Sequence, residues 1–164
     1  MTKNSIRSPL TSPLGDGERD VTCHALQATL LEMIDLHLFA KQEHWNVVGP
    51  NFRSAHLQLD ELVSTTRDFA DDVAERMSAL AVSPDGRSAT VAQGSGLHHP
   101  HAGWRTVEQV VDDVVAALSE VVHRLRARID ETDKTDQVTQ DLLIQITASL
   151  EKARWMWQAQ QQKK

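Results

Sequence analysis

Two histidines and three acids in the first half of the sequence have types and spacings that would suit a metal site. His56 and Asp60 are four residues apart, and Asp71 and Glu75 repeat that interval further along. On one α-helix these four side chains share a stripe that lies apart from the apolar residues. His44 precedes a turn and can approach the His56 end. Two imidazoles and three carboxylates suit iron, with open positions left for an oxidant or water.

The two pairs cannot surround one ion from a single helix, because Asp60 and Asp71 lie roughly 16 Å apart along a helical axis. An antiparallel copy of the same helix, related by a two-fold axis near residue 66, would place the acids of one chain opposite the histidine pair of the other. The alternative is a surface of solvated charges, in which Arg53 and Arg67 pair with these acids. Spacing alone leaves both interpretations open.

Other polar residues give weaker signals. A self-contained di-iron bundle needs two Glu-x-x-His elements, and Glu120 with His123 form the single one in the sequence. These two residues are therefore predicted to be exposed or interfacial. His37 is predicted to be buried or interfacial rather than a ligand. The loop run "HHPH" is predicted to be an exposed polar stretch, and it contains His98, His99 and His101.

Composition excludes several classes of protein. The 164 residues suit one domain, and 17 basic against 23 acidic residues give a formal charge of -6, which disfavours a generic nucleic-acid surface. A single cysteine fits a reducing compartment, and no apolar run reaches the roughly eighteen residues of a membrane span. We expect a soluble, cytoplasmic protein without a membrane partner.

The apolar pattern predicts an all-α chain, and strands look unfavourable. Residues 1–19 are predicted to be a flexible tail, 20–160 one domain, and 161–164 a short second tail. Helices are predicted from about residue 20 to the "VVGPN" turn, and over about 51–80, 106–130 and 135–160. The link from Ser83 to about Gly103 is long enough to hold a short helix in "GRSATVAQG" and to cross the bundle. Helices two and three would then be parallel, which is the ferritin-like four-helix connection.

The stretch "KQEHWNVVGPNFRSAHLQLDEL", followed by "DDVAERMSAL" and "LEKARWM", closely resembles the Dps proteins, the mini-ferritins named as DNA-binding proteins from starved cells. The resemblance covers about residues 20–160. It implies a ferritin-like subunit, a hollow dodecameric shell, and iron sites shared between two-fold related subunits. Carried over by residue, one subunit supplies His44, His56 and Asp60, and the other supplies Asp71 and Glu75.

The resemblance also implies a function. Such a shell is a ferroxidase that oxidises Fe(II), preferably with hydrogen peroxide, and stores Fe(III) mineral, which protects DNA and the cell from oxidative damage. Trp45 matches the tryptophan beside the family's iron site. Asp141 matches an acidic position of the pores through which iron enters, and Asp136 is a weaker pore candidate.

Two alternatives stay open at the level of sequence: an architectural DNA-compacting protein of stressed or stationary-phase cells, and a helical assembly without chemistry. Family members that bind DNA use tails rich in Lys or Arg. Here residues 1–20 carry three basic and three acidic side chains, and the C-terminus adds only Lys163 and Lys164. We expect weak or no direct DNA binding, so nucleoid association is the less favoured localisation.

Overall fold

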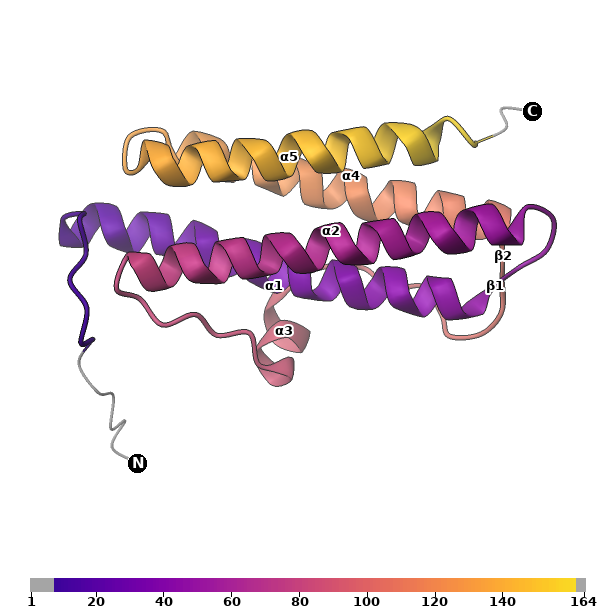
Figure 1. Cartoon of the computed structure of the whole chain (residues 1–164), viewed down its shortest axis with the longest axis horizontal. Helices are drawn as coiled ribbons and strands as arrows, with labels where there is room; N and C mark the ends of the chain where they lie inside the picture. The colour runs from indigo at the N-terminus through magenta and orange to yellow at the C-terminus, as the bar shows by residue number, and fades with distance from the viewer. Residues whose placement is uncertain (1–7, 162–164) are drawn as a thin grey trace.

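The computed structural model describes residues 8–161 of the chain (Figure 1). The predictions for residues 1–7 and for Lys163 and Lys164 lie outside the described residues. The elements in order are α1 (Asp16–Asn46), β1 (Val47–Val48), α2 (Phe52–Ala79), α3 (Ser88–Gly94), β2 (Arg105–Thr106), α4 (Val107–Thr132) and α5 (Gln137–Gln158).

Four long helices form the bundle, with α1 packed along α2 and α4 packed along α5. In Figure 1, α2 and α4 both begin at the end of the bundle that carries β1 and β2, so they run parallel. The link between them travels the length of the bundle and holds α3, which packs on α1. The predicted all-α, ferritin-like bundle with a short helix in its long link is confirmed.

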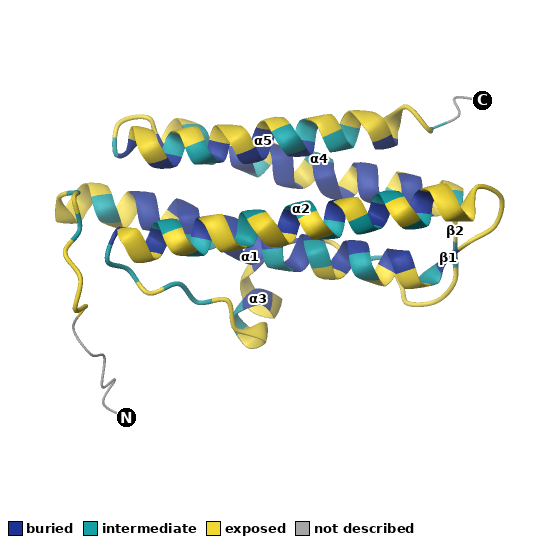
Figure 2. Ribbon diagram, in the orientation of Figure 1, coloured by how far each residue is buried: buried dark blue, intermediate teal, exposed yellow. Residues whose placement is uncertain are grey.

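The core lies between the two helix pairs, where each long helix turns its apolar stripe inward (Figure 2). This burial is the main source of helix stability, because helices in proteins are stabilised mostly by the packing of an apolar face. The largest fully buried side chains include Trp157, Phe39, Leu26, Met33, Leu59, Met77, Leu118, Leu125 and Ile146. Over residues 8–161, no helix is both long enough and apolar enough to traverse a membrane.

The turn between α1 and α2 has the conformation that its sequence favours. Gly49 has φ 106° and Asn51 has φ 62°, a left-handed backbone that glycine and asparagine adopt most readily. The Phe52 amide donates to the Gly49 carbonyl at 3.1 Å. The tight turn holds the last residues of α1 beside the first turns of α2.

Two corrections to the sequence predictions concern short segments. β1 and β2 form a parallel two-residue pair, in which Val47 is opposite Arg105 and Val48 is opposite Thr106. Strands were not predicted, because two residues are too few to show an alternating pattern. Helix α1 begins at Asp16 rather than near residue 20. The Glu18 carboxylate accepts from the Gly15 amide at 3.3 Å, so a charged residue stabilises a helix start within a segment that reads as a tail.

Two buried ion clusters tie the helices together. The Glu32 carboxylate of α1 is 2% exposed and accepts from Arg128 of α4 at 2.6 and 3.1 Å, and also from Arg124. Asp136 caps α5 and accepts from Arg76 of α2 at 2.5 Å. These clusters join α1 to α4 and α2 to α5 across the bundle.

Candidate metal centre

His44, His56 and Asp60 lie together at the turn end of the bundle. Each offers one ligand atom, and these atoms all lie within 4.8 Å of one another. His44 belongs to the last turn of α1, whereas His56 and Asp60 stand one turn apart near the start of α2. The tight turn between the helices thus gathers two imidazoles and a carboxylate from residues that span only seventeen positions.

The two histidines orient each other through the backbone. His44 Nδ1 lies 2.9 Å from the His56 carbonyl oxygen, and His56 Nδ1 lies 3.0 Å from the His44 carbonyl oxygen. A carbonyl oxygen only accepts, so each Nδ1 carries the proton and each Nε2 keeps a lone pair. The rings stack with centroids 3.6 Å apart. Metal-binding histidines commonly donate their other N–H to a carbonyl in this way, which fixes tautomer and ring orientation.

Asp60 has a cationic neighbour that the sequence did not indicate. The Lys41 ammonium donates to Asp60 Oδ1 at 2.6 Å, and the same oxygen lies 3.3 Å from His44 Nδ1. The hydrogen bond from Lys41 is the main reason that the pKa of Asp60 lies below its ordinary value. Asp60 is therefore a carboxylate kept ionised, which is the form that binds a cation.

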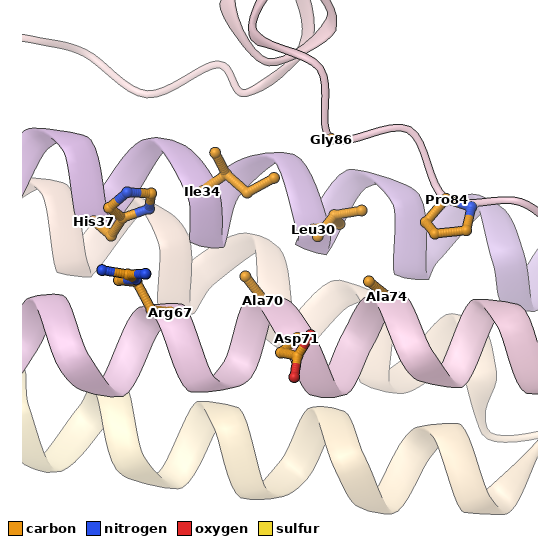
Figure 3. A pocket seen from close by; sticks show the side chains of 9 residues that line it. All are labelled: Leu30, Ile34, His37, Arg67, Ala70, Asp71, Ala74, Pro84 and Gly86. Carbon is orange, nitrogen blue, oxygen red and sulfur yellow. The ribbon is translucent and has the colours of Figure 1, made fainter.

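The other two predicted ligands lie elsewhere on α2. Asp71 and Glu75 are exposed, and neither belongs to the His44 group of the described chain. Asp71 lines a hollow of about 320 Å³ between α1, α2 and the link after α2. Figure 3 shows Leu30, Ile34 and His37 of α1 facing the α2 residues of this hollow, with Pro84 and Gly86 at its edge. Within one chain, the five predicted ligands thus lie in two separate places.

The alternative interpretation, in which Arg53 and Arg67 pair with the acids of α2, has little support within the subunit. Among residues 8–161, neither Arg53 nor Arg67 makes an ion pair within 4.0 Å. Arg67 instead lines both the hollow beside Asp71 and a second hollow beside Asp60. Asp71 and Glu75 therefore make no ion pair among the described residues, whereas Asp60 is paired with Lys41.

Known proteins are similar to this chain in sequence and in fold. The sequence matches the ferritin-like domain family over residues 23–164. A DNA protection during starvation protein of Mycolicibacterium smegmatis is 34% identical over 146 residues, 89% of this chain and 80% of that protein. The structure of Dps from Microbacterium arborescens in the high iron form superposes with a TM-score of 0.86, at 31% identity, and covers 92% of this chain and 97% of that one.

The chain belongs to the Dps family. A further relative is the fine tangled pili major subunit of Haemophilus ducreyi, which is 35% identical over 135 residues, 82% of this Dps chain and 71% of that protein. Sequence similarity at this level therefore extends to a protein described by a different role.

Other residues singled out from the sequence of this Dps chain do not belong to the His44 group, although Trp45 is its neighbour in the chain. Glu120 and His123 are exposed on α4, and Glu120 lies 3.9 Å from Arg124. Trp45 follows His44 directly and is 63% exposed, so it is open to a partner. His37 lines the hollow beside Asp71, and burial, followed by the charge of Arg67, lowers its pKa.

The loop histidines differ from one another. His98, His99 and His101 are all exposed, as predicted, but only His99 contacts α1 through the interactions described next. His99 Nε2 lies 3.0 Å from Asp35 Oδ1, and its ring packs against Phe39 with centroids 5.8 Å apart. Ser95 donates to the other oxygen of Asp35. Through these two contacts, the Asp35 carboxylate of α1 holds the segment that follows α3 against α1.

The two pore candidates have different surroundings. Asp136 is buried and accepts from Val138, Thr139 and Arg76. Burial would raise the pKa of Asp136, but the hydrogen bonds from Thr139 and Arg76 outweigh it, and its pKa lies below the ordinary value. Asp141 is exposed and accepts from Gln145 at 2.6 Å. Of these two side chains, only that of Asp141 is exposed. A pore role stays a prediction for both residues.

Sequence reasoning missed the buried acid that precedes His44 in the sequence. Glu43 is 2% exposed, and its Oε2 has no hydrogen-bond partner in the described chain. Burial raises its pKa to about 7, and the nearby Asp113 carboxylate adds to the rise. Neither the position of Glu43 in a helix nor its neighbours in the sequence could have indicated this, because Asp113 comes from another helix.

Proposed function

We propose that this Dps-family protein is an iron-sequestering ferroxidase, which oxidises Fe(II) and stores Fe(III) mineral inside a dodecameric shell. The observation that carries the proposal is the His44, His56 and Asp60 group, with both imidazoles held in the metal-binding tautomer. The Microbacterium arborescens relative, whose solved structure is described as a high iron form, supports iron as the substrate.

Each oxidation site is proposed to be shared. His44, His56 and Asp60 of one subunit face Asp71 and Glu75 of a two-fold related subunit. The separation of the two halves on α2 supports this arrangement, because one rigid helix cannot bring them to one ion. Trp45, exposed beside the site, would lie in the same interface.

The proposed reaction uses hydrogen peroxide in preference to oxygen. Two ferrous ions each give one electron, the peroxide O–O bond breaks, two protons are taken up, and two water molecules and two ferric ions result. Because peroxide takes both electrons, no hydroxyl radical is released. Imidazole nitrogen and carboxylate oxygen are ligands that ferrous iron accepts, and the carboxylates stabilise the higher ferric charge.

Protection of DNA would then be chemical, through removal of ferrous iron and peroxide in the cytoplasm. The relative from Mycolicibacterium smegmatis is named for DNA protection during starvation. We do not propose architectural DNA compaction, because the formal charge of -6 opposes the approach of phosphates.

Iron oxidation tests the proposal. Anaerobic Fe(II) is added to the metal-free assembly, peroxide is added, and ultraviolet absorbance follows the ferric product while size-exclusion chromatography reports assembly. The His44→Ala, His56→Ala double variant should lose most of the rate. The matched control is His24→Ala, His123→Ala, which removes two exposed imidazoles elsewhere and should keep the rate. Equal rates in the two double variants would defeat the ferroxidase proposal.

Mixing variants tests the shared site. The His44→Ala, His56→Ala variant should be inactive alone, and so should the Asp71→Asn, Glu75→Gln variant. When equal amounts are unfolded together and reassembled, a mixed pair contains one intact site and one doubly damaged site. Random pairing therefore restores about a quarter of the wild-type sites. No recovery in mixed shells of the correct size would show that each site belongs to one subunit.

A further inference from the structure

The histidine run in the link after α3 contains one ring that is already held in place. His99 Nε2 lies 3.0 Å from Asp35 Oδ1, and Ser95 donates to the other oxygen of that carboxylate. Asp35 is only 9% exposed, so the imidazole is bonded to a buried group of α1. The Phe39 ring meets the imidazole at an interplanar angle of 71°, with centroids 5.8 Å apart. Two contacts from α1 therefore fix the orientation of the His99 ring.

This arrangement leaves the other ring nitrogen of His99 for a ligand. A carboxylate accepts, so Nε2 carries the proton and Nδ1 of the neutral ring keeps a lone pair. Among residues 8–161, that Nδ1 makes no hydrogen bond, and the His99 side chain is 41% exposed. Histidines that bind metal commonly donate their far N–H to a carboxylate, because the contact fixes the tautomer and raises the basicity of the ring. His99 therefore has the surroundings of a metal ligand.

His98 and His101 place two more imidazoles beside this ring. Both side chains are exposed, and no helix or strand includes residues 98–101. Pro100 favours an extended backbone at His99, and side chains two residues apart on an extended chain lie on the same side. In the described residues the three rings do not yet form a group with ligand atoms within 4.8 Å of one another. Binding must therefore turn the exposed rings of His98 and His101, which costs mainly the entropy of ordering them.

The donor set indicates which kind of ion would bind. Imidazole nitrogen suits zinc, copper and nickel, and zinc accepts three protein ligands with water completing its tetrahedron. The place is separate from the candidate iron centre, because Asp35 and His44 are nine residues apart on α1, or roughly 13 Å along its axis.

We propose that His99 is the anchored ligand of a second metal site, which takes Zn²⁺ with His98 and His101 as its other protein ligands. Asp35 acts through His99, so it is a positioning residue rather than a ligand. The inference goes beyond the proposed function and does not depend on it, since none of these residues belongs to the His44 group. Bound zinc ties the exposed histidines to the segment that Asp35 holds against α1.

The probe is Zn²⁺ alone, titrated into the assembled metal-free protein near neutral pH and followed by calorimetry. The titrations use the His44→Ala, His56→Ala background, so that the candidate iron centre does not contribute, and size-exclusion chromatography checks assembly. In this background we expect one Zn²⁺ per subunit. The matched control adds His24→Ala and His123→Ala, which remove two exposed imidazoles elsewhere and should leave the zinc affinity unchanged.

Three further variants in the same background separate a metal site from a simple clasp. His99→Ala should abolish zinc binding, and so should His98→Ala with His101→Ala, because one imidazole alone holds zinc weakly. Asp35→Asn keeps an acceptor for His99 but removes the charge, so zinc should still bind with roughly ten- to a hundredfold lower affinity. If His99 only fastens the link, the zinc affinity is equal in all of these variants, and that result would overturn the site.

A crystal of the unaltered chain soaked in Zn²⁺ tests the site without any substitution. Anomalous scattering at the zinc absorption edge should show a peak about 2.0–2.1 Å from His99 Nδ1. Absence of that peak would overturn the inference, and so would a peak held by His98 and His101 away from His99. Either failure leaves the proposed function standing, because iron oxidation is tested at other residues.

Discussion

Replacing Arg128 by methionine should destabilise the bundle strongly. The change removes two hydrogen bonds, at 2.6 and 3.1 Å, from a Glu32 carboxylate that is 2% exposed. Hydrogen bonds to charged groups contribute about 1.5–3 kcal/mol each, and breaking one partner of a buried ion pair costs about 3–5 kcal/mol. Arg124 still donates to Glu32, so we expect a loss near the lower end, about 3 kcal/mol in the free energy of unfolding.

A double-mutant cycle tests the physical reason. In Glu32→Leu, Arg128→Met no buried charge lacks its partner, and Arg124 can turn toward Glu120, which already lies 3.9 Å away. The double variant should therefore lose at least about 2 kcal/mol less than the sum of the two single losses.

Urea unfolding followed by far-ultraviolet circular dichroism gives the free energies. One protein concentration is used throughout, because assembly adds to apparent stability. The control is Arg126→Met, which removes a surface pair with Glu151 at 2.5 Å and should cost less than about 1 kcal/mol. Equal losses of unfolding free energy in Arg126→Met and Arg128→Met would refute the proposed cost of an unpaired buried charge. It would also be refuted if the loss in the double variant equalled the sum of the losses in Glu32→Leu and Arg128→Met.

Two further predictions concern pH and DNA. Between its ordinary pKa of 4.5 and its folded value of about 7, Glu43 keeps a proton in the folded chain that it loses in the unfolded chain, so stability falls as pH rises through this window. In metal-free protein, Glu43→Gln should flatten this fall and raise the free energy of unfolding at pH 8 by about 2 kcal/mol. Urea unfolding at several pH values measures this free energy. An unaltered pH profile would contradict the raised pKa of Glu43. In gel retardation of linear DNA across a salt series, we expect either no shifted band or a shifted band that disappears at moderate salt, because phosphate binding needs accumulated positive charge. A shifted band that persists at high salt would contradict this expectation.

The sequence was sufficient for features that depend on one helix or one turn. Helical spacing placed His56 and Asp60 one turn apart, and the Gly49 turn brought His44 to them. Periodicity and the length of the link after α2 predicted a ferritin-like bundle, which the parallel course of α2 and α4 confirms. These features are local, or they follow from how far a chain segment must travel.

Features that depend on contacts between helices could not be predicted. Periodicity identifies the face on which Lys41 lies, but not that its ammonium reaches Asp60 across the gap to α2. Glu32 sits within an apolar stretch of α1, and its partners lie more than ninety residues away. The sequence likewise offered Arg53 and Arg67 as partners for the acids of α2, because spacing does not distinguish cations that meet a carboxylate from cations that do not.

The exchanged hydrogen bonds between His44 and His56 affect the order in which a shell can be built. Their partners are twelve residues apart, so only a short loop closes when they form. The histidine half of each site can therefore reach its final geometry in a lone subunit, before iron or a neighbour arrives. In the proposed shell, assembly would then add Asp71 and Glu75 to ligands that are already aligned, and an empty shell should keep its sites ready for the first ferrous ion.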